Sequence, residues 1–392
     1  MTALFTLAFV IGCGSSTSTT SVATTSTQTS TPTQTSTSTQ TSTSTPSGRR
    51  VPAEWEPQEA VWLQWPRNYE RSYEPAFAKI VATIVNYENT HIIVHDEATK
   101  TAARNALATV GELSADVIDG APTAAGFQII WHDVPNDSAW MRDNGPVYVE
   151  VDGEMHIQDW IFDGWGGAFG NFPVSDDDAV PVYVGDYLKL NVDTVDIVHE
   201  RGNLEFNGSD TVILNWSVLG DPNRNPDLTK PIATKALKGA FGVENVIYIE
   251  GVPAGDLTKG HVDGIARFID KNSVVVADCG PSSACAPGGA DDQVYDSAAS
   301  TIEAAGFEVI RWVFPGSATY NGATFDIDYM NWIVGNGFVI TVGFDNPKTD
   351  ADAAVQLKEW FPDRDIFVIE MLDSWYNGGG VHCHTNDQPA LQ

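Results

Sequence analysis

Apolar and polar residues follow two different periods along this chain. Between residues 77 and 85 the apolar positions have the spacing of one helix face, and a short apolar run at 92–94 then predicts a strand. The same criterion predicts a helix over 97–110 and an extended segment over 127–131. Helices therefore alternate with strands, which is the pattern of an α/β fold.

Three predicted hairpins interrupt this alternation. Their turns contain the pairs Asp152-Gly153 and Asn207-Gly208 and the triplet 335–337, and each turn joins two apolar segments. The joined segments are 146–151 with 155–160, 204–206 with 211–216, and 329–334 with 338–342. Further helices are predicted over 232–241, 293–305 and 350–360.

The recurring unit is thus a hairpin, a helix and another strand. Repetition of such a unit predicts several similar modules packed around an axis. One doubly wound sheet is the less favoured arrangement, because it needs long runs of parallel strands without so many hairpins.

The first 48 residues differ in composition from the rest. They contain no Asp, Glu, Lys or Arg, and few large apolar residues follow Ile11. Such a segment buries too little apolar surface to offset the conformational entropy of folding. We therefore expect one large folded domain over residues 49–392, preceded by an extended, solvated Ser/Thr-rich linker over residues 14–48.

Residues 1–13 have the features of an export signal. The apolar run at 4–11 leads into Gly12 and Cys13, the pattern of a bacterial lipoprotein cleavage site. This run is too short to cross a bilayer, which takes about 20 apolar residues. We expect Cys13 to be the lipidation site and the protein to be exported, periplasmic or at the cell surface, with a lipid anchor as its only membrane contact. A plain signal peptide cleaved elsewhere is the alternative.

The formal net charge is −31, and all of it falls on residues 49–392. A surface this acidic repels nucleic acid, which excludes nucleic acid as a partner, and it attracts cations. A small cationic substrate would be steered toward it. High charge also serves solubility, so charge alone does not decide between these two roles.

Two of the four cysteines, Cys279 and Cys285, flank the short loop 280–284. Outside the cytoplasm such a pair can form a disulfide, and the sequence leaves their pairing open. No second pair of Cys or His lies nearby in the sequence, which argues against a zinc site.

Cys383 is the candidate nucleophile. It follows three consecutive glycines, 378–380, and lies between His382 and His384. Glycines allow the backbone to approach a ligand closely and to adopt conformations that other residues resist. A single cysteine in an apolar run is otherwise most often an inert core residue.

Four further residues supply groups that such a thiol needs. His261 and Asp263 lie two apart, so on a strand they would face the same side, where the carboxylate holds a substrate and the imidazole moves protons. Asp143 precedes a turn, and Glu200 precedes Arg201. Each of these two acids alone also has a structural explanation, as a turn aspartate or as a partner of the neighbouring arginine.

Taken together, these residues resemble the family of agmatine deiminases and bacterial, Porphyromonas-type peptidyl-arginine deiminases, part of the guanidino-group-modifying superfamily. The resemblance covers most of residues 52–389. It is carried by ordered motifs at 52–57, 62–66, 140–143, 162–167, 223–226, 260–268, 329–332 and 378–389.

The resemblance implies a five-bladed α/β propeller of pseudo-fivefold ββαβ units with the site at its centre. It implies that Cys383 is the nucleophile, His261 the general acid and base, and Glu200 the acid that orients the imidazole. No cofactor is expected.

The same resemblance makes Asp143 and Asp263 the clamps of the guanidinium and adds further substrate-binding residues, Trp140, Trp165 and Asn331. A guanidinium is planar and always charged, so two carboxylates can fix it through charge-assisted hydrogen bonds. Sulfur then attacks the held carbon, the imidazole protonates the leaving nitrogen, and water releases a ureido product from a covalent thiouronium. We therefore expect hydrolytic deimination.

Agmatine is the expected substrate, and an arginine-containing peptide is the alternative. Agmatine, which would give N-carbamoylputrescine and ammonia, ends in an amine, whereas arginine and a C-terminal peptidyl arginine end in a carboxylate that calls for Arg or Lys. No Lys or Arg occurs over residues 143–187, and this stretch includes the acidic run 176–178, which favours agmatine. Export favours an arginine-containing peptide, which would be citrullinated. A non-catalytic surface protein that binds guanidino ligands or basic peptides is the third reading, and ammonia release would exclude it.

One position departs from the family pattern. Many relatives have two glycines after the glutamate, whereas this chain has Arg201-Gly202. A guanidinium close to the site is expected to disturb or extend it.

Overall fold

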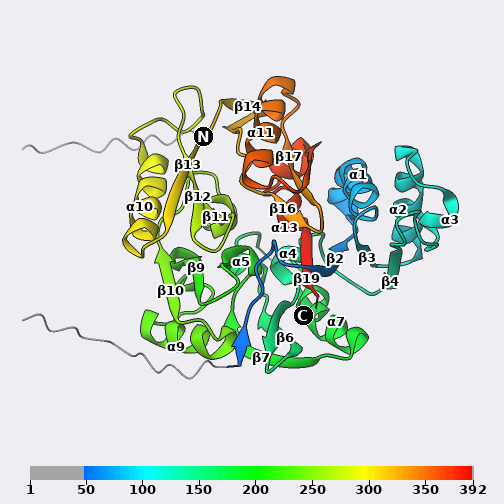
Figure 1. Cartoon of the computed structure of the whole chain (residues 1–392), viewed down its shortest axis with the longest axis horizontal. Coiled ribbons are helices and arrows are strands. Elements are labelled where there is room, and N and C mark those ends of the chain that lie inside the picture. Colours follow the sequence, from blue (N-terminus) through cyan, green and yellow to red (C-terminus); the bar gives the residue numbers. More distant parts are fainter. Residues whose placement is uncertain (1–47, 171, 391–392) are drawn as a thin grey trace, which may run out of the picture. The chain divides into compact units, whose positions relative to one another are not determined.

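A computed structural model describes residues 48–170 and 172–390 of the chain (Figure 1). The predicted signal segment 1–13, its lipidation site Cys13 and nearly all of the predicted linker 14–48 lie outside the described residues. Within the described residues, no helix is both long enough and apolar enough to cross a membrane.

The first predicted elements are confirmed with small shifts of their ends. Helix α1 (Glu74–Ile84) buries its apolar face, and β3 (Asn89–Val94), α2 (Glu97–Val110) and β4 (Ile129–Asp133) follow it. Helix α2 begins where its sequence directs, because the Asp96 carboxylate accepts the amide of Thr99 at 2.8 Å. It ends at Gly111, whose φ of 74° suits a glycine.

The three predicted hairpins are also present. They pair β5 (Val147–Val151) with β6 (Glu154–Ile161), β8 (Glu205–Phe206) with β9 (Thr211–Asn215), and β16 (Ile333–Gly335) with β17 (Phe338–Gly343). The first strand of the third hairpin was predicted too long. Residues 329–332 form a loop before β16, and this loop carries Asn331.

Four of the sheets that the described residues form share one pairing pattern, an antiparallel pair followed by a parallel strand. Their strand orders are β5-β6-β7, β8-β9-β10, β11-β12-β13 and β16-β17-β18. The strands not yet bounded are β7 (Asn191–Val198), β10 (Asn245–Ile249), β11 (Ala266–Phe268), β12 (Ser273–Asp278), β13 (Glu308–Val313) and β18 (Asp365–Glu370). The parallel connections run through α7 (Val180–Leu188), α9 (Lys230–Phe241), α10 (Ala290–Ala304) and α11 (Pro347–Trp360). Small separate sheets of this kind exclude one continuous doubly wound sheet among the described residues.

A fifth sheet joins the two ends of the described chain. Strand β19 (Thr385–Pro389) pairs antiparallel with β2 (Gln58–Gln64), which pairs parallel with β3, and β3 with β4. In Figure 1 the red β19 accordingly lies beside the blue β2. This pairing fixes the segment just before β19, which contains Cys383.

The remaining elements are short. They are β1 (Arg49–Arg50), which extends the β5 sheet, the hairpin β14 (Ser317–Tyr320) with β15 (Ala323–Asp326), the helices α3 (Ala115–Ile118), α4 (Met141–Asn144), α5 (Gly164–Gly167), α6 (Ser175–Asp178), α8 (Trp216–Leu219), α12 (Leu372–Tyr376) and α13 (Val381–His384), and the 3-10 turns η1 (Asn68–Tyr73), η2 (Arg201–Asn203) and η3 (Val262–Gly264). Four of these are linked by contacts in the order α13, α4, η2 and η3, and they carry or directly adjoin most of the candidate site.

Burial of the central strands accounts for their apolar sequences. All residues of β9 and β17 are buried, as are the first five of β12. Strands covered on both faces read as continuous apolar runs rather than alternating ones. The rigid core that results holds the short helices and turns of the site in place.

Candidate active site

Cys383 lies on the short helix α13 and is 5% exposed. It is the only free cysteine among the described residues. The glycines before it are required by close packing: a Cβ on Gly379 would lie 2.6 Å from the Cys383 sulfur and 2.8 Å from the Trp140 ring. The glycine run therefore brings the backbone against the thiol.

Asn331 holds this segment from the loop before β16. Its Oδ1 accepts the backbone amides of Gly380 at 3.1 Å and His382 at 3.0 Å. Its Nδ2 lies 3.2 Å from the Cys383 Sγ and 3.2 Å from Asp263 Oδ2. The side chain therefore fixes the thiol relative to the carboxylate.

His261 precedes the 3-10 turn η3, so the prediction that it shares a strand with Asp263 is wrong. The turn nevertheless brings both residues to one cavity. His261 Nδ1 lies 3.6 Å from Asp143 Oδ1, and its Nε2 lies 3.5 Å from Glu200 Oε2. Gly202 permits this approach, because a Cβ there would lie 2.7 Å from His261 Nδ1 and 2.6 Å from Asp143 Oδ1.

The charges around His261 set its protonation. Burial by itself lowers the pKa of His261, but the carboxylates of Asp143 and Glu200 outweigh it and raise the pKa to about 9. Burial raises the pKa of Asp143 to about 6. Burial also acts to raise the pKa of Glu200, but Arg224 and His261 outweigh it and hold that pKa at about 2. The imidazole is therefore protonated at neutral pH beside an ionised Glu200.

The thiol has the opposite environment. Burial, together with the charges of Asp263 and Asp143, raises the pKa of Cys383 well above its ordinary value. Burial, Arg142 and Arg267 hold the pKa of His382 well below its ordinary range. His382 Nδ1 donates to Asp263 Oδ2 at 2.7 Å, and its Nε2 lies 3.1 Å from Glu54 Oε2. Burial by itself raises the pKa of Asp263, but this hydrogen bond together with the nearby charges of His261 and Arg267 outweighs burial and keeps that pKa below its ordinary value.

Trp165 supports Asp143 from an unusual backbone conformation. Its φ of 60° and ψ of 45° are left-handed, between glycines that are also left-handed at positions 164, 166 and 167. This conformation costs a non-glycine residue about 1 kcal/mol or more, and such residues concentrate at functional sites. The turn points the indole N–H at Asp143 Oδ2, 2.9 Å away.

Arg201 does not enter the site, so the expectation that it disturbs or extends the site is wrong. Its Nη2 lies 2.8 Å from Asp387 Oδ2, and Arg142 holds the other oxygen of Asp387 at 2.8 Å. The guanidinium that does touch a site residue is Arg224, whose Nε donates to Glu200 Oε1 at 2.8 Å. The side chains of Arg224 and Glu200 are both fully buried.

Two cavities meet at Cys383. The first, called the aromatic chamber here, has a volume of about 270 Å³ and is lined by the rings of Tyr69, Trp140, Trp165, Phe169, Phe172 and Tyr376. The second, the acidic chamber, has a volume of about 490 Å³ and is lined by the carboxylates of Asp256, Asp263, Asp291, Asp326 and Asp328. Both chambers share Leu257, Thr258, Tyr376, Gly378 and Cys383. In the described part of the chain no Lys or Arg lines either chamber.

The acidic run 176–178 has a different role from the one considered for it. Asp177 is fully buried, and its carboxylate accepts from Gln64 Nε2 at 2.9 Å and from the Ser138 hydroxyl at 2.6 Å. None of the three aspartates lines either chamber. The run stabilises the loop before Trp140 and does not contact the site.

The predicted site residues therefore come together, with Asp143, Trp140 and Trp165 on the aromatic side and His261, Asp263 and Asn331 on the acidic side. Sequence reasoning assigned no role to Arg224 or His382. The signal for His382 was its position beside Cys383. The signal for Arg224 was the family-like motif at 223–226, but its contact with Glu200, 24 positions away along the chain, could not be seen in the sequence.

One cluster of carboxylates outside the site has the spacing of possible metal ligands. Among the described residues, Asp278, Asp292 and Asp296 form such a group. Arg311 pairs with Asp278 at 3.1 Å and with Asp296 at 2.8 Å, and Asp292 accepts backbone amides. These carboxylates already have protein partners, so no metal role is assigned to them.

Known proteins match this chain over nearly all of the described residues. The sequence profile of the Porphyromonas-type peptidyl-arginine deiminase family matches residues 50–389. An agmatine deiminase of Pseudomonas aeruginosa is 28% identical over 381 residues, covering 88% of this chain and 96% of that protein.

The solved structures of two agmatine deiminases, from Enterococcus faecalis and C. jejuni, both superpose with a TM-score of 0.73 at 23% and 20% identity, covering 88% of this chain and 97% of each of theirs. At these identities they show the fold. The family profile, by contrast, spans most of the chain, so the chain belongs to the Porphyromonas-type peptidyl-arginine deiminase family and is a hydrolase that acts on amidines.

Proposed function

We propose that the protein deiminates agmatine, giving N-carbamoylputrescine and ammonia through a covalent intermediate on Cys383. One observation carries this proposal: two chambers meet at a buried thiol, and their described walls offer carboxylates and aromatic rings but no Lys or Arg. A carboxylate on the substrate's tail would find no partner there. The names of the similar deiminases support the same reaction class.

Binding uses two carboxylates from opposite sides of the thiol. Asp143 lines the aromatic chamber and Asp263 the acidic chamber, so a guanidinium between them faces Cys383. Among the described residues, no group hydrogen-bonds to Asp143 Oδ1. Indole and imidazole donors already hold the second oxygen of each acid. These bonds orient both carboxylates for charge-assisted hydrogen bonds to the substrate.

The bound cation also activates the nucleophile. It neutralises the two carboxylates that raise the pKa of Cys383, so this pKa falls on binding and the thiol proton passes to solvent. The thiolate then attacks the guanidino carbon and forms the C–S bond. Protonated His261 donates to one nitrogen, the C–N bond breaks, and ammonia leaves a cationic thiouronium.

Hydrolysis completes the cycle. His261, now neutral, takes a proton from water while the hydroxide adds to the thiouronium carbon. The C–S bond breaks, Cys383 leaves as a thiolate, and loss of a proton gives the neutral ureido product. Glu200 Oε2 orients the His261 imidazole from 3.5 Å. The other oxygen of Glu200 accepts a hydrogen bond from Arg224 Nε at 2.8 Å.

A substrate panel tests the proposal. Agmatine, arginine and peptides with internal or C-terminal arginine would each be scored for ammonia and for ureido product. Turnover of agmatine well above that of arginine and the peptides is expected. Preferential citrullination of peptides would favour the alternative function, a surface peptidyl-arginine deiminase, and absence of ammonia from every substrate would favour a non-catalytic binding protein.

We also propose that the protein is exported and lipid-anchored through Cys13. The Cys279–Cys285 disulfide supports export, since structural disulfides persist mainly in oxidising compartments. Labelling of cells with a radioactive fatty acid would test the anchor: label on the wild-type protein and none on the Cys13→Ala variant is expected.

We further propose that the five repeated sheets close into a five-bladed propeller. The shared pairing pattern of the units, and a fifth sheet built from both chain ends, support this closure. An experimental structure with measurable fivefold pseudosymmetry would test it.

A further inference from the structure

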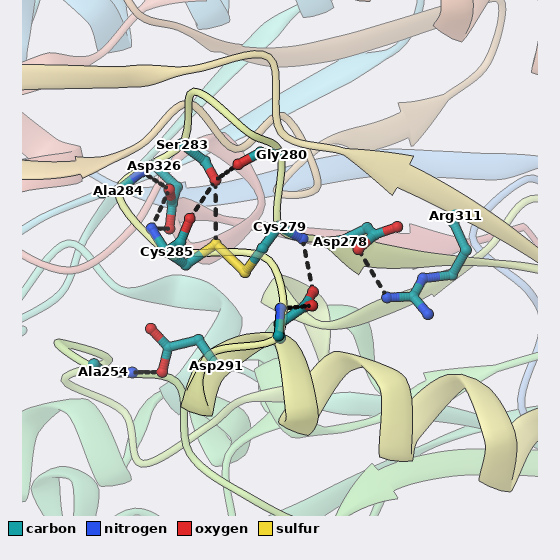
Figure 2. The surroundings of a disulfide bond; sticks show 12 residues. Ala254, Asp278, Cys279, Gly280, Ser283, Ala284, Cys285, Asp291, Arg311 and Asp326 are labelled. Carbon is teal, nitrogen blue, oxygen red and sulfur yellow. Dashed lines mark hydrogen bonds and ion pairs between the residues drawn. A yellow bond between two sulfur atoms is a disulfide. The ribbon is translucent and has the colours of Figure 1, made fainter.

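A loop closed by a disulfide forms part of the wall of the acidic chamber. Cys279 and Cys285 form a disulfide, and Ala284 and Cys285 line the chamber next to Asp326 (Figure 2). The disulfide thus belongs to the same cavity as the nucleophile, although its cysteines lie about 100 residues before Cys383 in the sequence.

The disulfide loop holds Asp326 directly. The carboxylate of Asp326 accepts the amide of Ala284 at 2.5 Å and the amide of Cys285 at 3.0 Å. Figure 2 shows both amides pointing at this carboxylate, which comes from the end of β15. Burial raises the pKa of Asp326, while the two amides act against this shift. The loop therefore both positions the carboxylate and favours its charged form.

The loop is fixed at both of its ends. The bond to Cys279, which follows β12, closes the loop on one side. The Ser283 hydroxyl lies 2.6 Å from the carbonyl oxygens of both Gly280 and Cys285 and bonds within the loop. Asp292 of α10 ties the start of the loop to the segment after it, because its carboxylate accepts the amides of both Cys279 at 3.2 Å and Gly288 at 2.6 Å.

A second contact extends this support to the boundary between the chambers. Asp291 accepts the amide of Ala254 at 2.9 Å, and Ala254 begins the segment that carries Asp256 and Leu257 along the chamber wall. Without the covalent bond, the residues between β12 and α10 regain the conformational freedom that the cross-link removes. The amides that hold Asp326 would then no longer be fixed.

We propose that the Cys279–Cys285 disulfide is a positioning element that fixes the acidic wall for a second positive charge on the substrate, and so sets a preference for dicationic over monocationic guanidines. This inference rests on the proposed deiminase function and extends it. The guanidinium end contacts Asp143 and Asp263, and the distal ammonium enters the acidic chamber near Asp326.

A comparison of two substrates isolates the contribution of the distal charge from that of the guanidinium. Agmatine carries both charges, whereas 1-butylguanidine has the same four-carbon chain without the ammonium. The quantity to measure is the ratio of kcat/KM for agmatine to kcat/KM for butylguanidine. In the Cys279→Ser/Cys285→Ser variant this ratio should fall about fivefold, the size expected for one partly screened charge pair. The fall should come from a higher KM for agmatine, with kcat for butylguanidine unchanged.

A double-mutant cycle tests the route through Asp326. Asp326→Asn alone should lower the ratio about as much as the disulfide variant, and combining the changes should lower it little further. Asp352→Asn, which removes the same charge from the exposed face of α11, is the matched control and should leave the ratio unchanged in both backgrounds. Thermal melts of each variant would identify any that fails to fold. If the Cys279→Ser/Cys285→Ser variant fails, Cys279→Ala/Cys285→Ala replaces it.

The proposal is overturned if the folded disulfide variant keeps the wild-type ratio, or if it loses activity equally on both guanidines, because the disulfide would then be merely structural. Additive effects of Asp326→Asn and the disulfide variant would also overturn it. Failure of the proposed function is distinguishable: the wild-type enzyme would then release ammonia from neither guanidine.

Discussion

Aromatic rings line both of the chambers beside Cys383, but the two chambers differ in the number of carboxylates that they contain. The aromatic chamber offers rings and one carboxylate, Asp143, whereas the acidic chamber offers five carboxylates and the disulfide wall. Rings suit the flat faces and methylene groups of a ligand, and carboxylates suit its charges. The difference teaches that a single cation between the chambers is held from both sides, while charge beyond it is attracted to one side only.

The strongest test concerns the point that both chambers share. Cys383→Ala should lower kcat/KM for every guanidine by more than about 10³-fold, because no neighbouring group can replace the thiolate as nucleophile. The measurement is the rate of ammonia release as a function of agmatine concentration. Retention of a hundredth of the wild-type rate would place the nucleophile elsewhere.

The next test compares the clamps, one from each chamber. Asp143→Asn and Asp263→Asn should each lower kcat/KM by roughly 30-fold or more, corresponding to ~2 kcal/mol for a charge pair broken on one side. Because both acids are proposed to contact the guanidinium, agmatine and butylguanidine should be affected alike. Normal kinetics in both variants would show that the two chambers do not share the guanidinium.

The pH profile of kcat/KM should be bell-shaped, with limbs that belong to different groups. Below about pH 6, Asp143 gains a proton and no longer pairs with the guanidinium, since its pKa lies at about 6. Above about pH 9, His261 loses the proton it gives to the leaving nitrogen, since its pKa lies at about 9. Rates measured across this range should therefore peak between the two values, and the acid limb should disappear in Asp143→Asn.

Alkylation of the thiol would sharpen the same comparison. A neutral haloacetamide should react slowly with Cys383 at pH 7, because burial and two carboxylates raise the pKa of its thiol. A cationic haloacetamidine should inactivate faster, since it pairs with those carboxylates. Equal rates for both reagents, with a thiol titrating near pH 6, would indicate a standing thiolate–imidazolium pair instead.

The smallest effect is expected at Asp328, which lines the acidic chamber but differs from its neighbours. Burial raises the pKa of Asp328 to about 8, so the carboxyl is mostly protonated at neutral pH. A raised pKa of an acid means that the folded state loses stability as pH rises from the unfolded pKa toward 8. Asp328→Asn should therefore raise Tm relative to wild type more at pH 9 than at pH 6, while agmatine KM at pH 7 stays near the wild-type value.

Much of this protein could be predicted from its sequence. Local patterns gave α1, α2 and the three hairpins, because apolar periodicity and turn glycines act within a few residues. The glycine run before Cys383 predicted a close approach of the backbone to a ligand, and the structure shows Gly379 packed closely against Cys383 and Trp140. The candidate site residues could be identified from the sequence because each lies in a short motif with a distinct chemistry.

Only the tertiary structure decided which partner each charged group takes. Arg201, next to Glu200 in sequence, pairs with Asp387, while Arg224 holds Glu200. The acidic run 176–178 stabilises a loop, and the acidic wall of the site comes instead from segments near 256, 291 and 326. Ion pairs and cavities depend on distances between segments far apart in the chain. The sequence determined the chemistry that was available, and the packing of the sheets determined where that chemistry lies.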